Sequence, residues 1–298
     1  MRRVFLVGNL RYRWGIVEEL VRWNEWDEIK FVDSVEEIKG EGVAIVEKIP
    51  DFCPEGIEFY TPNQLEQIEI RTSIPIYIFG RKEVDFLDPI LGNYRVSKGE
   101  GNFWEVRVPS LSKSDAQKLL RREKRIVIGD LFKFLVQKMP PKKVGIAESC
   151  TGGRVSAYIT RVAGASALFD GGMVTYSNLI KQKWLGVREW SLEKYGAVSA
   201  EVVTQMVEGI IEKSRANYGI AISGIAGPTG GTPQKPVGTV YIGVGDRYQI
   251  WVEKYQFSGT RGYIQHQSAL TAVGMLIQFA QLYGILDNLL PDDEFEGF

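Results

Sequence analysis

Short apolar runs alternate with amphipathic stretches throughout the second half of this sequence, and that order constrains the fold more than any other feature. KVGIAES (143–149), GGMVTYS (171–177) and YGIAIS (218–223) have the length and apolar content of buried strands. Because strands that alternate with helices form layers, these runs predict an α/β domain with helices on both faces of one sheet. TVYIGVG (239–245) and QIWVEKYQF (249–257) follow each other directly, so they predict an antiparallel hairpin and a mixed sheet.

Helices are expected between and after these strands. Ser177 and Ser199 each precede a stretch with helical apolar spacing, in the position of an N-cap. Helical spacing also begins at about Ile128, in RIVIGDLFKFLVQKM, and a glycine pair opens the expected helix in GGRVSAYITRVAG (152–164). A long closing helix is expected from about Arg261 to Leu282.

The first hundred residues predict a separate, smaller α/β unit. RRVFLVG (2–8), EGVAIVEKI (41–49) and IPIYIFGR (74–81) are typical of strands, and GIVEELVRWNEW (15–26) is typical of a helix. The loop after the first strand lacks the glycine spacing of a dinucleotide-binding fingerprint. The residues themselves therefore assign no chemistry to this unit.

A charged segment lies between the two halves. SKSDAQKLLRREKR (112–125) carries six basic and two acidic residues, which favours a solvated helix or connector over a binding patch. A chain of 298 residues is also long for a single hydrophobic core. We therefore expect an α/β domain over residues 1–110, a charged linker over 111–126 and a layered α/β domain over 127–298.

Composition argues against several classes of partner. The 36 basic and 37 acidic residues leave a net charge of -1, which disfavours nucleic acid and anionic membranes. The sequence contains no long uncharged apolar run, so we expect no signal peptide, no membrane span and a cytoplasmic location. Cys53 and Cys150 lie far apart and the chain has one histidine, so we expect two free thiols and no bound transition metal.

The run AESCTGG (147–153) is the first candidate for chemistry. It places Ser149, Cys150 and Thr151 in the turn between an expected strand and an expected helix. Free backbone N–H groups at such a turn can bind an anion or stabilise an oxyanion, and the two glycines allow a ligand to approach closely. Serine and threonine are also ordinary helix caps, so the motif alone leaves both interpretations open.

A serine nucleophile needs a base, and histidine is a poor candidate here. His266 is the only histidine, and its polar surroundings in YIQHQS are typical of a surface or interface position. Lys181 lies in the first turn and a half after Ser177, where the helix dipole lowers the pKa of a lysine, whereas Lys183 points to another face. A solvated helix lysine is the alternative interpretation, and spacing alone does not establish a pair.

A second candidate is the loop SGIAGPTGGTPQKPVGT (223–239). It carries five glycines and three prolines between residues 224 and 238. Prolines restrict the backbone and glycines permit unusual dihedral angles, a combination suited to a rigid loop of exposed N–H groups. An ordinary long connection is the alternative, and the loop matches no phosphate-binding fingerprint.

Read together, five motifs resemble the C-terminal domain of the competence-damage-inducible CinA family, whose enzymatic form is nicotinamide-nucleotide amidase. They are AESCTGG, GGMVTYSNLIK, GAVSAEV, SGIAGPTGGTPQKPVGTVYIG and FSGTR, in matching order across roughly residues 128 to 285. The resemblance implies hydrolysis of the carboxamide of nicotinamide mononucleotide without a metal or redox cofactor. It makes Ser149 the nucleophile and Lys181 the base, with Thr151 and Tyr176 assisting them.

The resemblance also implies a set of substrate-binding residues. This chain departs from the family pattern at two positions. Many relatives have threonine where this chain has Ser223, and a second arginine near the position where this chain has Gln265. The absence of that arginine weakens the expected phosphate binding. Two-domain relatives carry a molybdopterin-binding-like N-terminal domain, of which this chain has at most a degenerate version. The expected substrate-binding residues are Glu148, Gly152, Gly153, Ser223, Gly224, Gly227, Thr239 and, for the phosphate, Arg261.

Other functions compete with the amidase. One is a nucleotide-binding module without turnover, and another is an interaction protein in DNA uptake or repair. The presence of both Ser149 and Lys181 favours an enzyme, and Cys150 is a lesser candidate nucleophile because it lacks a histidine partner. The expected partners are a pyridine nucleotide and further copies of the chain in a homodimer or larger oligomer, with neither nucleic acid nor membrane.

Overall fold

The computed structural model describes residues 3–8, 28–39, 42–50, 57–61, 74–81, 83–91, 94–100, 103–108, 111–123, 125–139 and 141–284. The chain divides into two compact units, Met1–Ser73 and Ile74–Phe298.

The first unit contains a parallel sheet with strand order β2-β1-β3-β4. A sheet of parallel strands is typical of the α/β class that the sequence predicts for this unit. The strands expected near residues 2–8 and 41–49 are confirmed, and the helix expected over 15–26 lies outside the described residues. The elements are β1 (Arg3–Val7), β2 (Glu28–Val32), the 3₁₀ helix η2 (Val35–Glu37), β3 (Gly42–Ile45) and β4 (Ile57–Tyr60).

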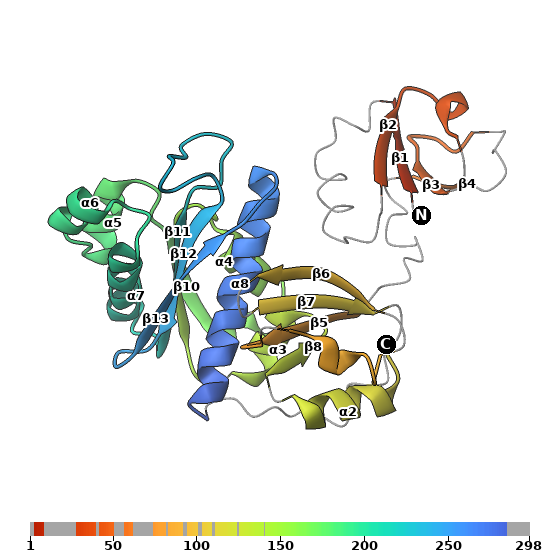
Figure 1. The fold of residues 1–298 in the computed structure, drawn as a ribbon. Coiled ribbons are helices and arrows are strands. Elements are labelled where there is room, and N and C mark those ends of the chain that lie inside the picture. The colour runs from red at the N-terminus through yellow and green to blue at the C-terminus, as the bar shows by residue number, and fades with distance from the viewer. Residues whose placement is uncertain are drawn as a thin grey trace. The chain divides into compact units, whose positions relative to one another are not determined.

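The second unit is built around a mixed five-stranded sheet, with strand order β10-β9-β11-β12-β13 (Figure 1). β9 pairs in parallel with β10 and with β11, while β12 is antiparallel to both of its neighbours. The predicted mixed sheet and its hairpin are therefore confirmed. The strands are β9 (Val144–Glu148), β10 (Phe169–Val174), β11 (Tyr218–Gly224), β12 (Thr239–Gly245) and β13 (Ile250–Gln256).

Helices cover both faces of this sheet. α7 packs its apolar side on one face, and α3, α4 and α8 share a core with the other face. The side chains of Ser177 and Ser199 accept hydrogen bonds from the first turns of α5 and α7, which confirms both predicted caps. The helices are α3 (Leu131–Lys138), α4 (Arg154–Thr160), the 3₁₀ helix η5 (Ala165–Ala167), α5 (Asn178–Leu185), α6 (Glu189–Tyr195), α7 (Ala200–Ser214) and α8 (Arg261–Leu282).

A second, antiparallel sheet in the same unit has the strand order β6-β7-β5-β8. Its aromatic side chains share a core with α8, so α8 lies between two sheets (Figure 1). This explains why α8 is buried around most of its circumference. The elements are β5 (Ile74–Phe79), the 3₁₀ helix η4 (Asp85–Leu87), β6 (Arg95–Glu100), β7 (Phe103–Val108), α2 (Lys113–Arg122) and β8 (Ile126–Ile128).

The observed boundaries differ from the expected ones. The division between units falls after Ser73 rather than after residue 110, because β5 pairs with β7 and β8. Residues 113–122 form a helix whose Ala116 and Leu119 are buried against this sheet, so the expected linker is a packed element. The helix expected from about Ile128 is present as α3, but it begins at Leu131, because residues 126–128 pair with β5 and Asp130 is the helix cap.

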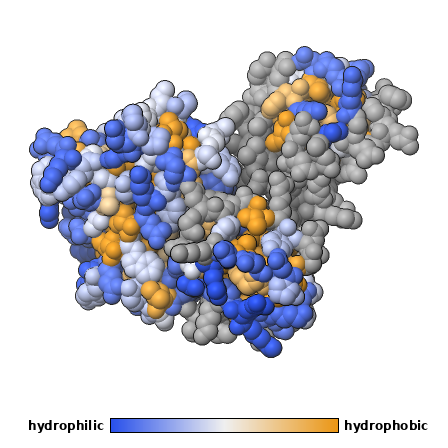
Figure 2. All heavy atoms as spheres, viewed as in Figure 1, coloured by the Kyte–Doolittle hydropathy of each residue, from blue (hydrophilic) through white to orange (hydrophobic). Residues whose placement is uncertain are grey.

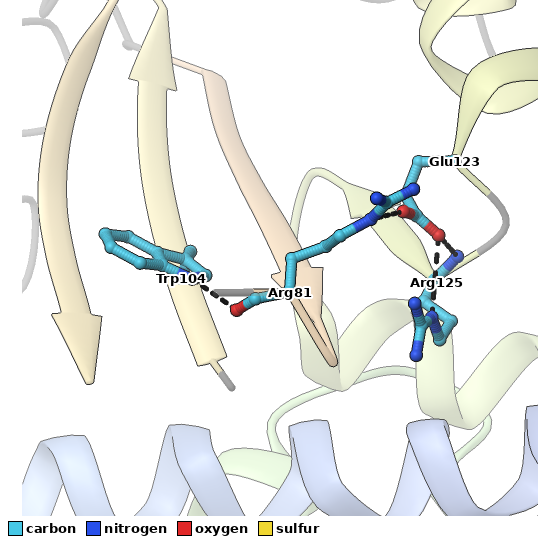
Figure 3. A network of polar contacts seen from close by, with 4 residues as sticks. All are labelled: Arg81, Trp104, Glu123 and Arg125. Atoms are coloured by element: carbon cyan, nitrogen blue, oxygen red, sulfur yellow. Dashed lines mark hydrogen bonds and ion pairs between the residues drawn. The ribbon is translucent and has the colours of Figure 1, made fainter. Parts of the chain in front are cut away.

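Glu123, just after α2, joins this helix to the sheet. Its carboxylate is 3% exposed and accepts hydrogen bonds from Arg81 Nε and from the backbone N–H of Arg125, while Trp104 Nε1 donates to the Arg81 carbonyl (Figure 3). Burial opposes ionisation of Glu123, but the Arg125 N–H and the Arg81 guanidinium prevail and hold its pKa below the ordinary 4.5. This buried charge is therefore ionised at neutral pH.

The face of the second unit seen in Figure 2 is mostly hydrophilic, with its hydrophobic residues in small separate groups. Such scattered apolar residues are normal on protein surfaces. Among the described residues, no helix is long and apolar enough to cross a membrane.

Close contact between α8 and the second sheet depends on Gly274. A Cβ atom there would lie 2.5 Å from Phe79 and 2.8 Å from Phe103. We expect Gly274→Ala to lower the free energy of unfolding by about 1–3 kcal/mol through overpacking. The control is Gly262→Ala in the same helix, where an added Cβ meets nothing within 4 Å, and it should be neutral or stabilising. Calorimetry of the full chain measures both, and equal unfolding temperatures would contradict this packing.

The lowered pKa of Glu123 makes its contribution to stability depend on pH. We expect Glu123→Gln to destabilise the second unit by roughly 1–3 kcal/mol at pH 7. The deficit should be complete above the ordinary carboxyl pKa of 4.5 and should vanish as the pH falls through the lowered pKa, because protonated Glu123 loses the same interactions. Urea unfolding of both proteins between pH 3 and 7 tests this, and a pH-independent deficit would refute the ionic explanation.

Candidate active site

Three separate segments meet at the carboxyl edge of the parallel strands. Glu148 at the end of β9 is in register with Val174 of β10 and with Ile222 of β11. Two hydrogen bonds tie the following residues together: the Ser149 N–H donates to the Ile222 carbonyl at 3.0 Å, and the Thr175 N–H donates to the Glu148 carbonyl at 2.7 Å. The turns after β9 and β10 are therefore adjacent, which is where α/β proteins usually carry their sites.

Ser149 and Lys181 lie in direct contact at this edge. The distance between Lys181 Nζ and Ser149 Oγ is 2.9 Å, although 32 positions separate the two residues in sequence. Lys181 is 1% exposed and Ser149 is 7% exposed. The structure thus brings together the two residues that sequence spacing alone could not pair.

The other contacts of Lys181 Nζ determine how it meets Ser149. Nζ also donates to the carbonyl oxygens of Thr175 at 2.7 Å and Tyr176 at 3.2 Å. A neutral amine has two N–H groups and one lone pair, and carbonyl oxygens can only accept. With both N–H groups engaged, the lone pair is left for the Ser149 hydroxyl, which can donate its proton. This is the geometry of a general base.

Burial lowers the pKa of Lys181 from 10.5 to about 8. A negative charge on Cys150 would raise it, but burial raises the pKa of that thiol to about 12, so Cys150 is neutral at pH 7. The predicted direction of the lysine shift is correct, and burial is its largest cause. The same burial makes Cys150 a poor nucleophile.

Glu148, expected to contact substrate, instead caps α4. Its carboxylate is fully buried and accepts hydrogen bonds from the N–H groups of Gly153, Val155 and Ser156 and from Ser156 Oγ, at 2.8 to 3.2 Å. The side chain of Glu148 therefore already engages these N–H groups at the N-terminus of this helix.

The two glycines of the turn have backbone angles that favour glycine, and they leave room for a ligand to approach, as the motif suggested. Gly152 and Gly153 have φ angles of 62° and 97°, in the left-handed region that favours glycine. A Cβ at Gly152 would meet no atom within 4 Å, so the space beside the turn is open. The turn can thus be approached closely from this side.

Thr151, Tyr176 and Arg261 have different surroundings. Thr151 is 1% exposed, and its hydroxyl has no hydrogen-bond partner among the described residues. Arg261 at the start of α8 donates to the Tyr176 hydroxyl at 3.1 Å and to the Gly227 carbonyl at 2.7 Å. The guanidinium of Arg261 therefore links the turn after β10 to the glycine-proline loop.

Two further expected contact residues are engaged in internal hydrogen bonds. Ser223 Oγ donates to the Ala197 carbonyl at 2.7 Å, and Thr239 Oγ1 donates to Gln256 Oε1 at 2.9 Å. Both side chains are buried. These hydroxyls hold the base of the glycine-proline loop, and their proton-donating capacity is already used.

Gly224 and Gly227 also shape this loop. A Cβ at Gly224 would lie 2.6 Å from Val240, and a Cβ at Gly227, whose φ is 76°, would lie 2.5 Å from Val237. The two glycines are thus required for close packing of the loop. The Gly227 carbonyl is the acceptor already described for Arg261.

The remaining sequence candidates lie away from the Ser149 hydroxyl. His266 Nδ1 is 3.0 Å from the Tyr158 hydroxyl, and Lys183 is exposed on the other side of α5. Among the described residues, no group of three His, Cys, Asp or Glu side chains could hold a metal ion. Cys150 is a free thiol, and Cys53 lies outside the described residues.

Sequence reasoning missed the contacts of Gln265. Its Nε2 donates to the Cys150 carbonyl at 2.7 Å, and its Oε1 accepts from Arg154 Nε at 3.2 Å. The sequence marked Gln265 only as the place of an absent arginine. Arg154 directly after the glycine pair was the available signal, but its pairing with a residue 111 positions away required the fold.

A buried serine–lysine pair at the edge of a layered α/β sheet is typical of a hydrolase site. The family model described as the CinA C-terminal domain matches residues 131–280, half of the chain. The chain therefore belongs to the CinA family.

Individual relatives support this assignment. A nicotinamide-nucleotide amidohydrolase PncC from Pseudomonas putida is 48% identical over 136 residues, which cover 46% of this chain and 85% of that protein. A CinA-like protein from Endomicrobium trichonymphae is 48% identical over 135 residues, which cover 45% of this chain and 32% of that protein. The matched region thus spans only about a third of the length of such CinA-like relatives.

Solved structures of the same family are also similar. The competence/damage inducible protein CihA from Agrobacterium tumefaciens is 36% identical, with a TM-score of 0.48, and the match covers 58% of this chain and 99% of that one.

The cap formed by Glu148 is testable because glutamine has nearly the same shape. We expect Glu148→Gln to lower the free energy of unfolding by about 1–3 kcal/mol, since one carboxylate acceptor becomes an N–H donor that faces other N–H groups. The control is Glu189→Gln, at an exposed carboxylate in the first turn of α6, which should change stability by about 0.5 kcal/mol or less. Thermal unfolding compares the variants, and equal losses would contradict the cap.

Proposed function

We propose that this chain hydrolyses the carboxamide of nicotinamide mononucleotide to nicotinate mononucleotide and ammonia, with Ser149 as nucleophile and Lys181 as base. The observation that carries the proposal is the 2.9 Å contact between Lys181 Nζ and Ser149 Oγ, with two carbonyl acceptors on the same amine. The substrate is taken from the Pseudomonas putida relative, which is named a nicotinamide-nucleotide amidohydrolase.

The chemistry requires Lys181 to accept a proton and give it up again in each of two half-reactions. Ser149 Oγ attacks the amide carbon while its proton passes to neutral Lys181, and a tetrahedral oxyanion forms. The C–N bond then breaks, and the ammonium of Lys181 gives its proton to the departing nitrogen, so that ammonia leaves and an ester to Ser149 remains. Water attacks this ester while Lys181 again accepts a proton. The ammonium of Lys181 then gives that proton to Ser149 Oγ as the ester C–O bond breaks, which releases the acid product and restores Ser149 and neutral Lys181. These residues supply nucleophile, base and acid without a metal.

We place the 5′-phosphate of the proposed substrate at Arg261 and the glycine-proline loop that Arg261 contacts, because the side chain of Glu148 already fills the N-terminus of α4. Arginine suits this role because its fork of N–H groups matches phosphate oxygens. The unpartnered hydroxyl of Thr151 is placed beside the reacting amide.

The first experiment measures ammonia release from nicotinamide mononucleotide by the purified full chain in EDTA. We expect turnover in the wild type and in Cys150→Ala, and a loss of 10²-fold or more in Ser149→Ala and Lys181→Met. Lys183→Met is the matched control, because that lysine lies two positions away and is exposed. Binding of the nucleotide without turnover in the wild type would instead favour a nucleotide-binding module.

The pKa of Lys181 predicts the pH dependence. Only neutral lysine accepts the serine proton, so we expect kcat/KM to rise about tenfold per pH unit below pH 8 and to level off above it. Lys181→Arg should be inactive at every pH, because arginine stays protonated. If the rate of the chemical step did not change between pH 6 and 9, Lys181 would be ruled out as the base.

A further inference from the structure

The turn that carries Ser149, here called the nucleophile turn (residues 149–152), contains two peptide groups whose carbonyl oxygens both accept hydrogen bonds. The Ser149 carbonyl accepts from the Gly152 N–H at 3.1 Å, within the turn. The Cys150 carbonyl accepts from Gln265 Nε2 at 2.7 Å, across the interface with α8. One anchor is therefore local, and the other comes from a helix that lies more than a hundred residues along the chain.

Anchoring a carbonyl also orients the N–H of the same peptide. A trans peptide is planar, and its C=O and N–H point in opposite directions. The only cis peptide among the described residues is Gly227-Pro228, so both peptides of the turn are trans. The Gly152 contact thus sets the direction of the Cys150 N–H, and Gln265 sets the direction of the Thr151 N–H.

These two N–H groups are not used by another residue that the structure describes. Within the described ranges, neither donates to the backbone or side chain of another residue, whereas the N–H groups of Gly153, Val155 and Ser156 are engaged by Glu148. They follow the nucleophile directly, in the position from which backbone donors stabilise the oxyanion of a tetrahedral intermediate.

We propose that Gln265 is a positioning residue that holds the Thr151 N–H as an oxyanion donor, with Arg154 orienting its amide. Arg154 Nε donates to Gln265 Oε1 at 3.2 Å, which leaves Nε2 to donate to the Cys150 carbonyl. An arginine at position 265 could contact this carbonyl, but it could not accept from Arg154, and the two cations would repel each other. Glutamine is thus matched to Arg154 in this chain.

The inference rests on the proposed role of Ser149 as nucleophile, and its test uses a reaction that does not depend on the natural substrate. A fluorophosphonate reacts when the Ser149 oxygen displaces fluoride from phosphorus, and charge develops on the phosphoryl oxygen that the same N–H groups would stabilise. Intact-mass measurement of the full chain gives the labelling rate, and Ser149→Ala shows which residue reacts.

Two variants remove the donor in different ways. Gln265→Met is similar in length and neutral, and Gln265→Glu keeps an acceptor for Arg154 but sets a carboxylate against the Cys150 carbonyl. We expect both to slow labelling of Ser149, and ammonia release, by roughly 10- to 100-fold. The unfolding temperatures of both variants are measured to ensure that folded proteins are compared. Gln265→Glu keeps its pairing with Arg154 but sets two acceptors against each other, so its unfolding temperature should fall only modestly. The matched control is His266→Gln, the next position of α8, which should label within about twofold of the wild type.

The outcomes separate this inference from the proposed function. If the wild type labels at Ser149 and the Gln265 variants are slow, the inference holds even where nicotinamide mononucleotide is not hydrolysed. If the wild type releases ammonia and both Gln265 variants match it in labelling and turnover, the inference is overturned and the amidase remains. A wild-type chain that neither labels nor releases ammonia overturns both.

Discussion

Strand β9 pairs in parallel with β10 on one side and with β11 on the other, so three segments far apart in the chain end at one edge of one sheet. Parallel strands share the direction of their carboxyl ends, and the turns that follow them must therefore be neighbours. Ser149 follows β9, the carbonyls that hold Lys181 follow β10, and the glycine-proline loop follows β11. The candidate site depends on this pairing before any side chain contributes.

The two ionisable side chains at that edge have different partners. The carboxylate of Glu148 accepts four hydrogen bonds from Gly153, Val155 and Ser156, which hold it at the start of α4. Among the described residues, the hydrogen-bond partners of Lys181 Nζ are carbonyl and hydroxyl oxygens, and burial lowers the pKa of this amine. One side chain thus stabilises the turn, and the other can act as a base near neutral pH.

Helix α8 connects the candidate site to the second sheet. Its first turns carry Arg261 and Gln265, which contact the loop and the nucleophile turn, and its middle packs through Gly274 against Phe79 and Phe103. The segment before the family domain therefore packs onto the helix that carries these two site residues.

The sequence by itself determined the fold class, the caps at Ser177 and Ser199, and the pairing order of the closing hairpin, because these depend on local periodicity and capping. It also marked Ser149 and Lys181 as candidates. It misjudged Ile128 and the segment 111–126, because a short apolar strand resembles the start of a helix and charged residues conceal a narrow buried face.

Only the tertiary structure decided which residues meet. The 2.9 Å contact of Lys181 with Ser149 and the bond from Gln265 to the Cys150 carbonyl join positions 32 and 115 residues apart. It also showed that Glu148, Ser223 and Thr239 are engaged in internal hydrogen bonds, and that burial lowers the pKa of Lys181. Burial and hydrogen-bond partners are properties of the packed chain, because residues distant in sequence supply them.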